Sequence, residues 1–326
     1  MHATRTPFKA DNQILSTMSI MNSVKATGIY RSINHWLETT YVTHDHIPLK
    51  KILSILLKQL AKDNLPQKGS AMAFSFVLSI FPSIIFIFTV IPYTPLPDAR
   101  GELMDFLSSN MPDTLYNAVY KTIEDIIIIP HGGLLSFGFV TALFSVTSGI
   151  RTMITAFNNC YRTKEDRSFI KLVMVATGLA LFLSFIFVIT IALSIFVRVY
   201  ISLLENDLLH NQEVYSSMLL FFKYLVLFGL FYFALSIIYY FAPVIHEKWS
   251  FFSIGAFIAA LCTVLFTVAF FFYISSFNSY NKVYGSIGAF IGIMMWFYIF
   301  SIVLLLGFEI NASIHMAQQE IRGKTT

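Results

Sequence analysis

Two charged residues that stand at or within long apolar runs are the strongest candidates for chemistry in this sequence. Arg151 interrupts the apolar run 134–157, and Glu309 directly follows the apolar run 283–308. A charge at the centre of a membrane helix costs about 2.5–3.5 kcal/mol, and less near an end, so such residues usually pair or face a polar cavity. We expect Arg151 and Glu309 to approach one another or to line one polar cavity. The alternative is that each side chain extends independently to the membrane surface.

Three uncharged residues belong to the same candidate set. Asn158 and Asn311 are close in sequence to the two charges and are expected at a similar depth, where their amides extend a polar network. Pro82 stands inside the apolar run 71–91, where a proline removes a backbone donor and crowds the preceding turn. It predicts either a hinge or cavity lining, or a static kink that neighbouring helices tolerate.

A polar stretch at residues 275–284 is dense in hydrogen-bonding groups, and its candidate residues are Asn278, Tyr280, Asn281 and Tyr284. We expect it at the outer end of the last two apolar runs, where it binds a lipid head group or caps two helices. Small residues follow at 285, 288, 289 and 292, and this spacing favours close contact between helices.

Recognised catalytic and metal-binding motifs are missing from the sequence. There is no glycine-rich phosphate loop and no HExxH, GxSxG or EF-hand pattern. The two cysteines, Cys160 and Cys262, lack the spacing of metal ligands and are expected to be unpaired. The nearest histidine pair, His44 and His46, falls in a polar segment. With no buried acid–base set in view, we predict no cofactor, no metal, no catalytic residue and no enzyme activity.

The elements that must position these residues are membrane helices. The chain is 56% hydrophobic and 12% charged, whereas soluble domains carry about 25% charged residues. Because the polar residues are too few to cover the apolar surface, the excess must face lipid. Six apolar segments reach or approach the about 20 residues that a spanning helix needs; they are 71–91, 134–157, 172–197, 224–242, 251–274 and 283–308. The predicted fold class is an all-α polytopic membrane protein with six transmembrane helices, since the runs are too uniformly apolar for barrel strands.

The placement of Lys and Arg predicts the orientation. Nine basic residues precede the first apolar segment, whereas residues 93–133 hold two basic and six acidic residues. Basic residues favour the cytoplasmic side, so both termini are expected in the cytoplasm.

The remaining segments complete the predicted domain organisation. Residues 1–47 are polar without a clear period and are expected to form a weakly ordered cytoplasmic extension. Residues 48–65 predict an amphipathic helix that lies on the membrane surface or packs on the rest of the protein. One or two short outer helices are expected within 93–133. The six-span domain covers 48–315, and 316–326 form a cytoplasmic tail.

Three stretches together resemble the YihY/virulence factor BrkB family of bacterial inner-membrane proteins. They are AMAFSFVLSIFP at 71–82, NNCYR at 158–162 leading to DR at 166–167, and FNSYNKVYGSIGA at 277–289 with Trp296 and LGFEIN at 306–311. The resemblance covers roughly residues 50–315 and implies six spans in the bacterial cytoplasmic (inner) membrane. The long polar start departs from the family's usual short one.

The resemblance also implies a function, because family members have been linked to virulence, serum resistance and envelope lipid traffic. The family has carried a ribonuclease label, but that chemistry needs paired carboxylates with metal, or His and Lys acid–base groups, near a basic RNA channel. The sequence shows none of these in the membrane core, so nucleic acid is not an expected partner.

We therefore predict a transporter or flippase-like protein for a lipid or other amphiphilic envelope molecule. Arg151 and Glu309 would line the cytoplasmic side of its cavity, and residues 278–284 the outer side. Membrane lipids are the expected partners, and an Arg favours an anionic head group. The alternative is a non-transporting membrane scaffold of an envelope complex. The sequence carries no signal for an oligomeric state.

Overall fold

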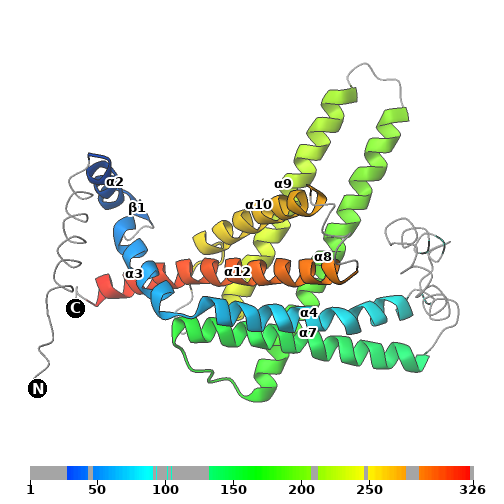
Figure 1. The fold of residues 1–326 in the computed structure, drawn as a ribbon, viewed down its shortest axis with the longest axis horizontal. Helices are drawn as coiled ribbons and strands as arrows, with labels where there is room; N and C mark the ends of the chain where they lie inside the picture. The colour runs from blue at the N-terminus through cyan, green and yellow to red at the C-terminus, as the bar shows by residue number, and fades with distance from the viewer. Residues whose placement is uncertain are drawn as a thin grey trace, which may run out of the picture. The chain divides into compact units, whose positions relative to one another are not determined.

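The computed structural model describes residues 28–42, 47–90, 93, 101, 104, 132–206, 212–245, 249–276 and 286–323, and helices dominate them (Figure 1). The chain divides into two compact units. One unit is Met1–Lys62 with Ala312–Thr326, and the other is Asp63–Asn311. The predicted outer helices within 93–133 fall almost entirely outside the described residues, as do residues 1–27.

The larger unit consists of long helices: α4 (Leu65–Val90), α7 (Gly132–Tyr161), α8 (Phe169–Asn206), α9 (Gln212–Phe241), α10 (Ile254–Ser276) and the greater part of α12 (Ser286–Arg322). Five helices in the described part are long and apolar enough to cross a membrane, namely α4, α7, α8, α9 and α12; α10 adds a shorter apolar stretch, Ile254–Phe270. The prediction of an all-α polytopic membrane protein is confirmed at this level.

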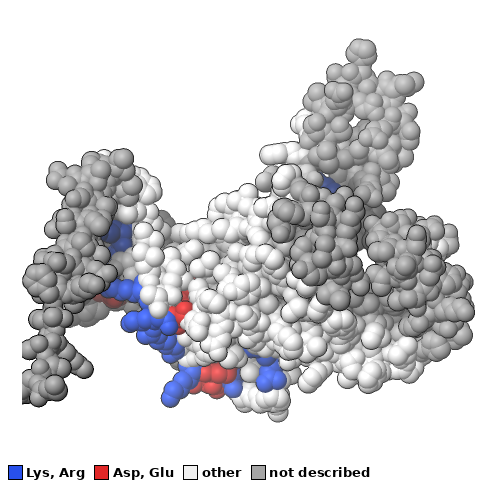
Figure 2. All heavy atoms as spheres, viewed as in Figure 1, with Lys and Arg blue, Asp and Glu red and all other residues white. Residues whose placement is uncertain are grey.

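Large apolar side chains lie on the outside of these helices as well as between them. Phe144 and Phe272 are 72% and 73% exposed, and many other Phe, Leu and Ile side chains share this position. Figure 2 shows that most of the described helical surface in that view carries no Lys, Arg, Asp or Glu. Exposed apolar surface on this scale needs hydrocarbon around it.

The core of the larger unit lies where α7, α9 and α12 meet. Phe157 stacks on Phe308 with ring centroids 4.5 Å apart, and Tyr239 packs edge-on against both rings. The Tyr239 hydroxyl donates a hydrogen bond of 2.7 Å to the Leu304 carbonyl, so the buried tyrosine leaves no unpaired hydroxyl. Helices α4 and α7 run side by side (Figure 1), with the Phe86 and Phe139 rings 5.5 Å apart.

Two glycines set how closely α10 and α12 cross. A Cβ on Gly255 would collide with the carbonyl oxygen of Gly307, and a Cβ on Gly307 would lie 2.5 Å from the Tyr239 hydroxyl. The close contact between helices thus occurs at Gly255 and Gly307. We predicted such contact for the small residues at 285, 288, 289 and 292, and the first three lie where no side chain is described.

The smaller unit contains α2 (Gly28–Thr39), β1 (Tyr41–Val42), β2 (Ile47–Pro48), α3 (Leu49–Lys62) and the end of α12. The two strands pair antiparallel, with Val42 opposite Ile47. Helix α2 differs from the weakly ordered extension that we predicted for residues 1–47. In its sequence Ile29, Ile33 and Leu37 are four residues apart, which is the spacing of one helical face. We did not use this spacing in our prediction for the segment.

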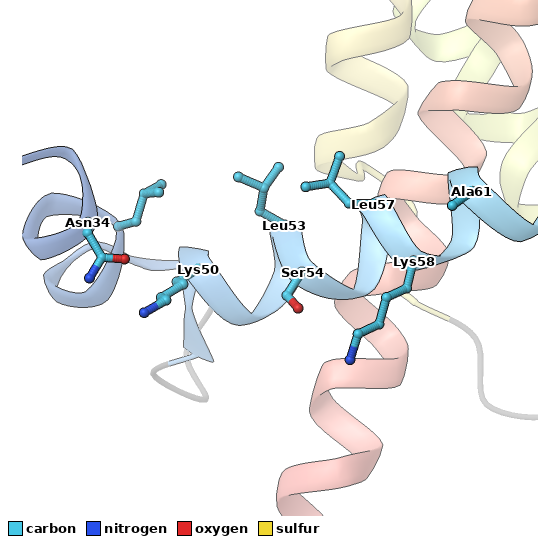
Figure 3. A pocket seen from close by; sticks show the side chains of 8 residues that line it. Asn34, Lys50, Leu53, Ser54, Leu57, Lys58 and Ala61 are labelled. Atoms are coloured by element: carbon cyan, nitrogen blue, oxygen red, sulfur yellow. The ribbon is translucent and has the colours of Figure 1, made fainter. Parts of the chain in front are cut away.

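Helix α3 confirms the helix predicted at 48–65. Its apolar residues lie on two faces, of which one is buried and the other is exposed. Ile52 is buried in a cluster with Ile47 and with Ala317 of α12. Leu53 and Leu57 stay exposed and line a groove of about 610 Å³ beside α2 (Figure 3). One face therefore packs on the protein, as one of our two alternatives required.

Candidate functional site

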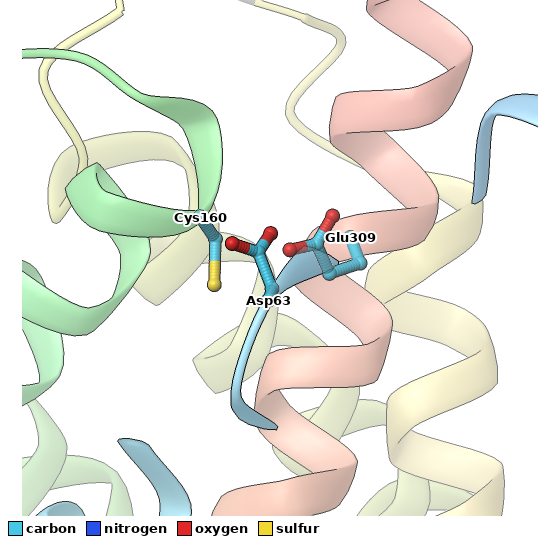
Figure 4. A group of neighbouring side chains, drawn as sticks. All are labelled: Asp63, Cys160 and Glu309. Atoms are coloured by element: carbon cyan, nitrogen blue, oxygen red, sulfur yellow. The ribbon is translucent and has the colours of Figure 1, made fainter. Parts of the chain in front are cut away.

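Three titratable side chains from distant parts of the sequence meet inside the unit Asp63–Asn311 (Figure 4). Asp63 lies in the turn before α4, Cys160 in the last turn of α7, and Glu309 on α12. One ligand atom from each lies within 4.8 Å of the other two. Cys160 and Glu309 are 0% exposed, so bulk solvent does not reach these two side chains.

The start of α4 fixes the position of Asp63. The Asn64 side-chain amide donates to Gln67 Oε1 at 3.0 Å, and the Lys68 backbone N–H bonds to the Asn64 carbonyl at 3.1 Å. Pro66 fits here because the N–H groups of a first helical turn have no partner within the helix. The turn therefore holds the Asp63 carboxyl group at the amino end of α4, where negative charge is favoured.

Lys68 supplies one positive charge to the cluster. Its ammonium nitrogen lies 3.2 Å from Asp63 Oδ1 and 3.3 Å from Cys160 Sγ. The other Asp63 oxygen and both Glu309 oxygens are buried and have no hydrogen-bond partner in the described part of the chain. Unpaired buried carboxylate oxygens are costly, so this cluster is built to accept a proton or a further cation.

Asn158 anchors the end of α7 to neighbouring segments. Its Oδ1 accepts a bond of 2.9 Å from the Val244 N–H, and its Nδ2 donates to Glu165 Oε2 at 2.8 Å. The Arg167 guanidinium donates two bonds to Glu165, of 2.7 and 2.9 Å, and one of 2.8 Å to the Ala242 carbonyl, and the Arg167 backbone N–H donates a third bond to Glu165 at 3.2 Å. These hydrogen bonds from Arg167 hold the pKa of the Glu165 carboxyl below its usual range.

Asn311 anchors α12 to the start of α10, as Asn158 anchors the end of α7. Its Oδ1 accepts from the Gly255 N–H and its Nδ2 donates to Ser253 Oγ, both at 2.8 Å. Ser253 Oγ also accepts from the Ala256 N–H at 3.3 Å, so serine and asparagine together cap the amino end of α10. Asn158 and Asn311 are thus buried anchors in two separate networks, and neither contacts Arg151.

Arg151 lies at a different place from Glu309. Its guanidinium carbon sits 4.8 Å from the centre of the Phe169 ring, a cation–π contact, and its buried Nε has no hydrogen-bond partner among the described residues. It faces a cavity of about 340 Å³ along α4 and α7, lined by two alanines and by Lys68, Ser148, Arg151, Thr152, Thr155 and Asn159.

The expected approach of Arg151 to Glu309 is not seen among the described residues. No ion pair joins them there, and Glu309 is not among the residues that line the Arg151 cavity. The physical reason is that Glu309 faces Asp63 and Cys160, while the Arg151 guanidinium is held over an aromatic ring.

The remaining predicted residues are placed as follows. Helix α4 runs unbroken through Pro82. A mostly apolar cavity of about 400 Å³ lies beside it, lined from five helices and including Ser79 and Ser83, whereas Pro82 is not part of its lining. Asn278, Tyr280, Asn281 and Tyr284 lie outside the described residues.

Our sequence reasoning missed Asp63, Lys68 and the role of Cys160. The expectation that the chain has no buried titratable set was wrong. Cys160 and Cys262 are both free, as predicted. The spacing of residues in the sequence could not predict the cluster of Asp63, Cys160 and Glu309, because these residues come from three segments that only the fold brings together.

The chain is similar to known proteins over a region that includes Asp63, Cys160 and Glu309. A family model described as virulence factor BrkB matches residues 56–326. The chain is 31% identical over 254 residues to the putative ribonuclease-like protein YfkH of Bacillus subtilis (strain 168), covering 76% of this chain and 89% of that protein. It is also similar to UPF0761 membrane proteins of Vibrio campbellii (27% identity, 79% of this chain and 80% of the relative) and Alteromonas mediterranea (26%, 82% and 88%). No solved structure matches the chain.

Proposed function

Because the chain belongs to the virulence factor BrkB family of bacterial membrane proteins, we propose that it transports or flips an amphiphilic envelope molecule with an anionic head group. In this proposal α10 is the sixth span beside the five long apolar helices, and both termini lie in the cytoplasm. The basic residues that precede α4 support this orientation.

The observation that carries the proposal is the charge of the Arg151 cavity. Lys68 and Arg151 both line it, four hydroxyl or amide side chains complete its polar surface, and no carboxyl group is among its lining residues. A phosphate or carboxylate head group matches this donor set, since Arg and Lys form charge-assisted bonds to such oxygens. The volume of about 340 Å³ is in the range of small-molecule sites.

The apolar cavity gives secondary support. It lies among α4, α7, α8, α9 and α12, and its lining is mostly Phe, Ile and Leu. An acyl chain fits such a surface without leaving polar groups unpaired. The same two helices, α4 and α7, contribute to this cavity and to the cation-lined one.

Transfer of labelled lipids in proteoliposomes tests the proposal. We expect the protein to accelerate transfer of phosphatidylglycerol more than that of phosphatidylcholine. Arg151→Gln should reduce the anionic transfer by roughly tenfold, because about 1.4 kcal/mol of head-group interaction is lost, whereas Arg151→Lys should retain part of it. Lys171→Gln is the matched control, since Lys171 is exposed and does not line the cavity. Transfer no faster than in empty liposomes for all lipids would contradict the proposal.

The topology has its own test. Reporters fused to the two ends should both be accessible from the cytoplasm, and a reporter after residue 276 should be accessible from the opposite side. Ends on opposite sides would rule out six spans.

We further propose that the chain lacks the ribonuclease activity that the name of the Bacillus subtilis relative suggests. Asp63 and Glu309 are a carboxyl pair, but Glu309 is 0% exposed, so an RNA strand has no access to it. Purified protein should leave RNA intact. Cleavage that survives purification and disappears in Glu309→Gln would overturn this proposal.

A further inference from the structure

We propose that Asp63, Cys160 and Glu309 form a binding site for a divalent metal ion of the zinc type. The proposal rests on the geometry of this cluster and is independent of the transport function proposed above. Carboxyl oxygens of Asp63 and Glu309 and the sulfur of Cys160 lie within 4.8 Å of one another, so small side-chain movements would bring all three within bonding distance of one ion. The cluster is the single group of this kind that the described residues contain.

The second observation is that the Glu309 carboxyl group is buried without a hydrogen-bond donor among the residues that the structure describes. Both of its oxygens are buried without a hydrogen-bond partner, although the residue is 0% exposed. Figure 4 shows its carboxyl group turned toward Asp63 and Cys160. Asp63 Oδ2 is also buried without a hydrogen-bond donor among them, so the neighbours of Glu309 in the cluster are a second carboxyl group and a thiol. A buried group of this kind is expected to have a partner, and a metal ion would take one oxygen from each carboxyl group together with the sulfur.

The donor set identifies the class of metal. Magnesium and calcium prefer oxygen ligands alone, whereas zinc accepts a thiolate together with carboxylates. Three protein ligands leave a fourth tetrahedral position for water. With its ligands deprotonated the set carries three negative charges, and Lys68 contributes one positive charge. A dication would therefore bring the local charge to zero.

The surrounding networks hold the three ligands in place before any ion arrives. The Asn158 network fixes the end of α7, the Asn311 network fixes α12 against α10, and the first turn of α4 fixes Asp63. A site on such supports needs little rearrangement to bind an ion. Bound metal would join α4, α7 and α12 at this one point and stabilise the folded protein.

Cobalt absorption gives a direct test, because a cobalt–thiolate bond produces a charge-transfer band in the near ultraviolet. The chain has two cysteines, so Cys262→Ser leaves Cys160 as its single thiol. Untagged Cys262→Ser protein, stripped of metal in detergent and titrated with Co²⁺, should show the band, and Zn²⁺ should displace it. Histidine or carboxylate sites elsewhere cannot produce this signal.

Variants then assign the other ligands. Glu309→Gln and Asp63→Asn, each in the Cys262→Ser background, should weaken Co²⁺ binding by roughly 100-fold or more, since loss of a direct ligand exceeds the loss of a supporting contact. Lys68→Met should instead tighten binding by roughly tenfold, because a like charge beside the ion is removed. Elution as a single species in size-exclusion chromatography identifies the variants that remain folded.

Two results would overturn the proposal. One is folded Cys262→Ser protein that shows no thiolate band at millimolar Co²⁺. The other is a band of equal strength in the Cys160→Ser, Cys262→Ser double variant. The first test needs only the Cys262→Ser protein, which keeps all three proposed ligands. It can therefore be decided even if a ligand variant fails to fold.

Discussion

Two polar regions within the unit Asp63–Asn311 have opposite charge. The cavity along α4 and α7 presents Lys68 and Arg151 and no carboxyl group among its lining residues. The Asp63–Cys160–Glu309 cluster presents two carboxyl groups and a thiol. Lys68 belongs to both, because it lines the cavity and also bonds to Asp63 and Cys160.

The two regions also differ in enclosure. The cavity includes the exposed residues Thr155 and Asn159, whereas Glu309 and Cys160 are fully buried. A partly exposed, cation-lined cavity suits an anionic ligand that arrives and leaves, and a buried, anion-rich cluster suits a resident cation. The opposite charge of the two neighbouring regions matches the two ligands that we propose, and Lys68 belongs to both regions.

The largest expected effect comes from separating α12 from α10. Gly307→Val places a side chain where the Tyr239 hydroxyl and Ala259 already lie. We expect the free energy of unfolding in mixed micelles to fall by about 3 kcal/mol, and metal binding at Glu309 to be lost with it. Anionic ligand binding should suffer less in the folded fraction, because the cavity is lined by α4 and α7.

Gly178→Ala is the control for this change, since nothing lies within 4 Å of a Cβ at that position. It should leave the free energy of unfolding unchanged or slightly higher, because alanine is the better helix former. Equal destabilisation by the two substitutions would contradict the account of the α10–α12 crossing.

Two adjacent asparagines provide the next comparison. Asn158→Ala removes the acceptor of the Val244 N–H and one of the two donors to Glu165 Oε2, and we expect a loss of about 1–3 kcal/mol in the free energy of unfolding. Asn159→Ala should cost less than about 0.5 kcal/mol, because Asn159 is exposed, yet it should weaken binding of an anionic lipid at the cavity. Chemical denaturation and lipid binding measured on both variants test this division of roles.

Acid should weaken the anchor at the end of α7. Arg167 holds the pKa of Glu165 below its unfolded value, so the ion pair stabilises the protein above the unfolded pKa and is lost as the pH falls through the lowered one. At neutral pH Arg167→Gln should therefore be less stable than the wild type by about 1 kcal/mol. The difference should shrink below about pH 4, where an ordinary glutamate becomes protonated. A difference independent of pH would show that the packing of Arg167, and not its charge, matters.

The smallest effect is expected in the other unit, Met1–Lys62 with Ala312–Thr326. Lys51 pairs with Glu320 at 3.1 Å, and both side chains are partly exposed. Lys51→Gln should change the free energy of unfolding by less than about 0.5 kcal/mol, because exposed ion pairs contribute little. It should leave both lipid transfer and metal binding at wild-type level.

The helices could be predicted because apolar length is a local property of the sequence. Each of the six predicted segments falls largely within one helix, and α3 matches the amphipathic run at 48–65. The ends were less predictable. Helices α8 and α9 extend well beyond their apolar runs, to Asn206 and back to Gln212, because a helix continues into polar sequence when nothing stops it.

The site was less predictable, because it depends on which faces of the helices meet. Sequence identified Glu309 and Asn158 as unusual, but it did not indicate the neighbours that the structure gives them, which are Asp63 and Cys160 for Glu309 and Glu165 and Val244 for Asn158. Asp63 and Cys160 carried no signal of their own, since a lone aspartate before a helix and a lone buried cysteine are both ordinary. The packing role of Gly307 was not predicted either, although this glycine permits the close crossing of α10 and α12.

Native mass spectrometry of the purified protein with phosphatidylglycerol and Zn²⁺ tests the two-region account most directly. Arg151→Gln should lose the bound lipid and keep the metal, whereas Glu309→Gln should lose the metal and keep the lipid. Loss of both ligands in each folded variant, or of neither, would contradict the assignment of opposite ligands to the two regions.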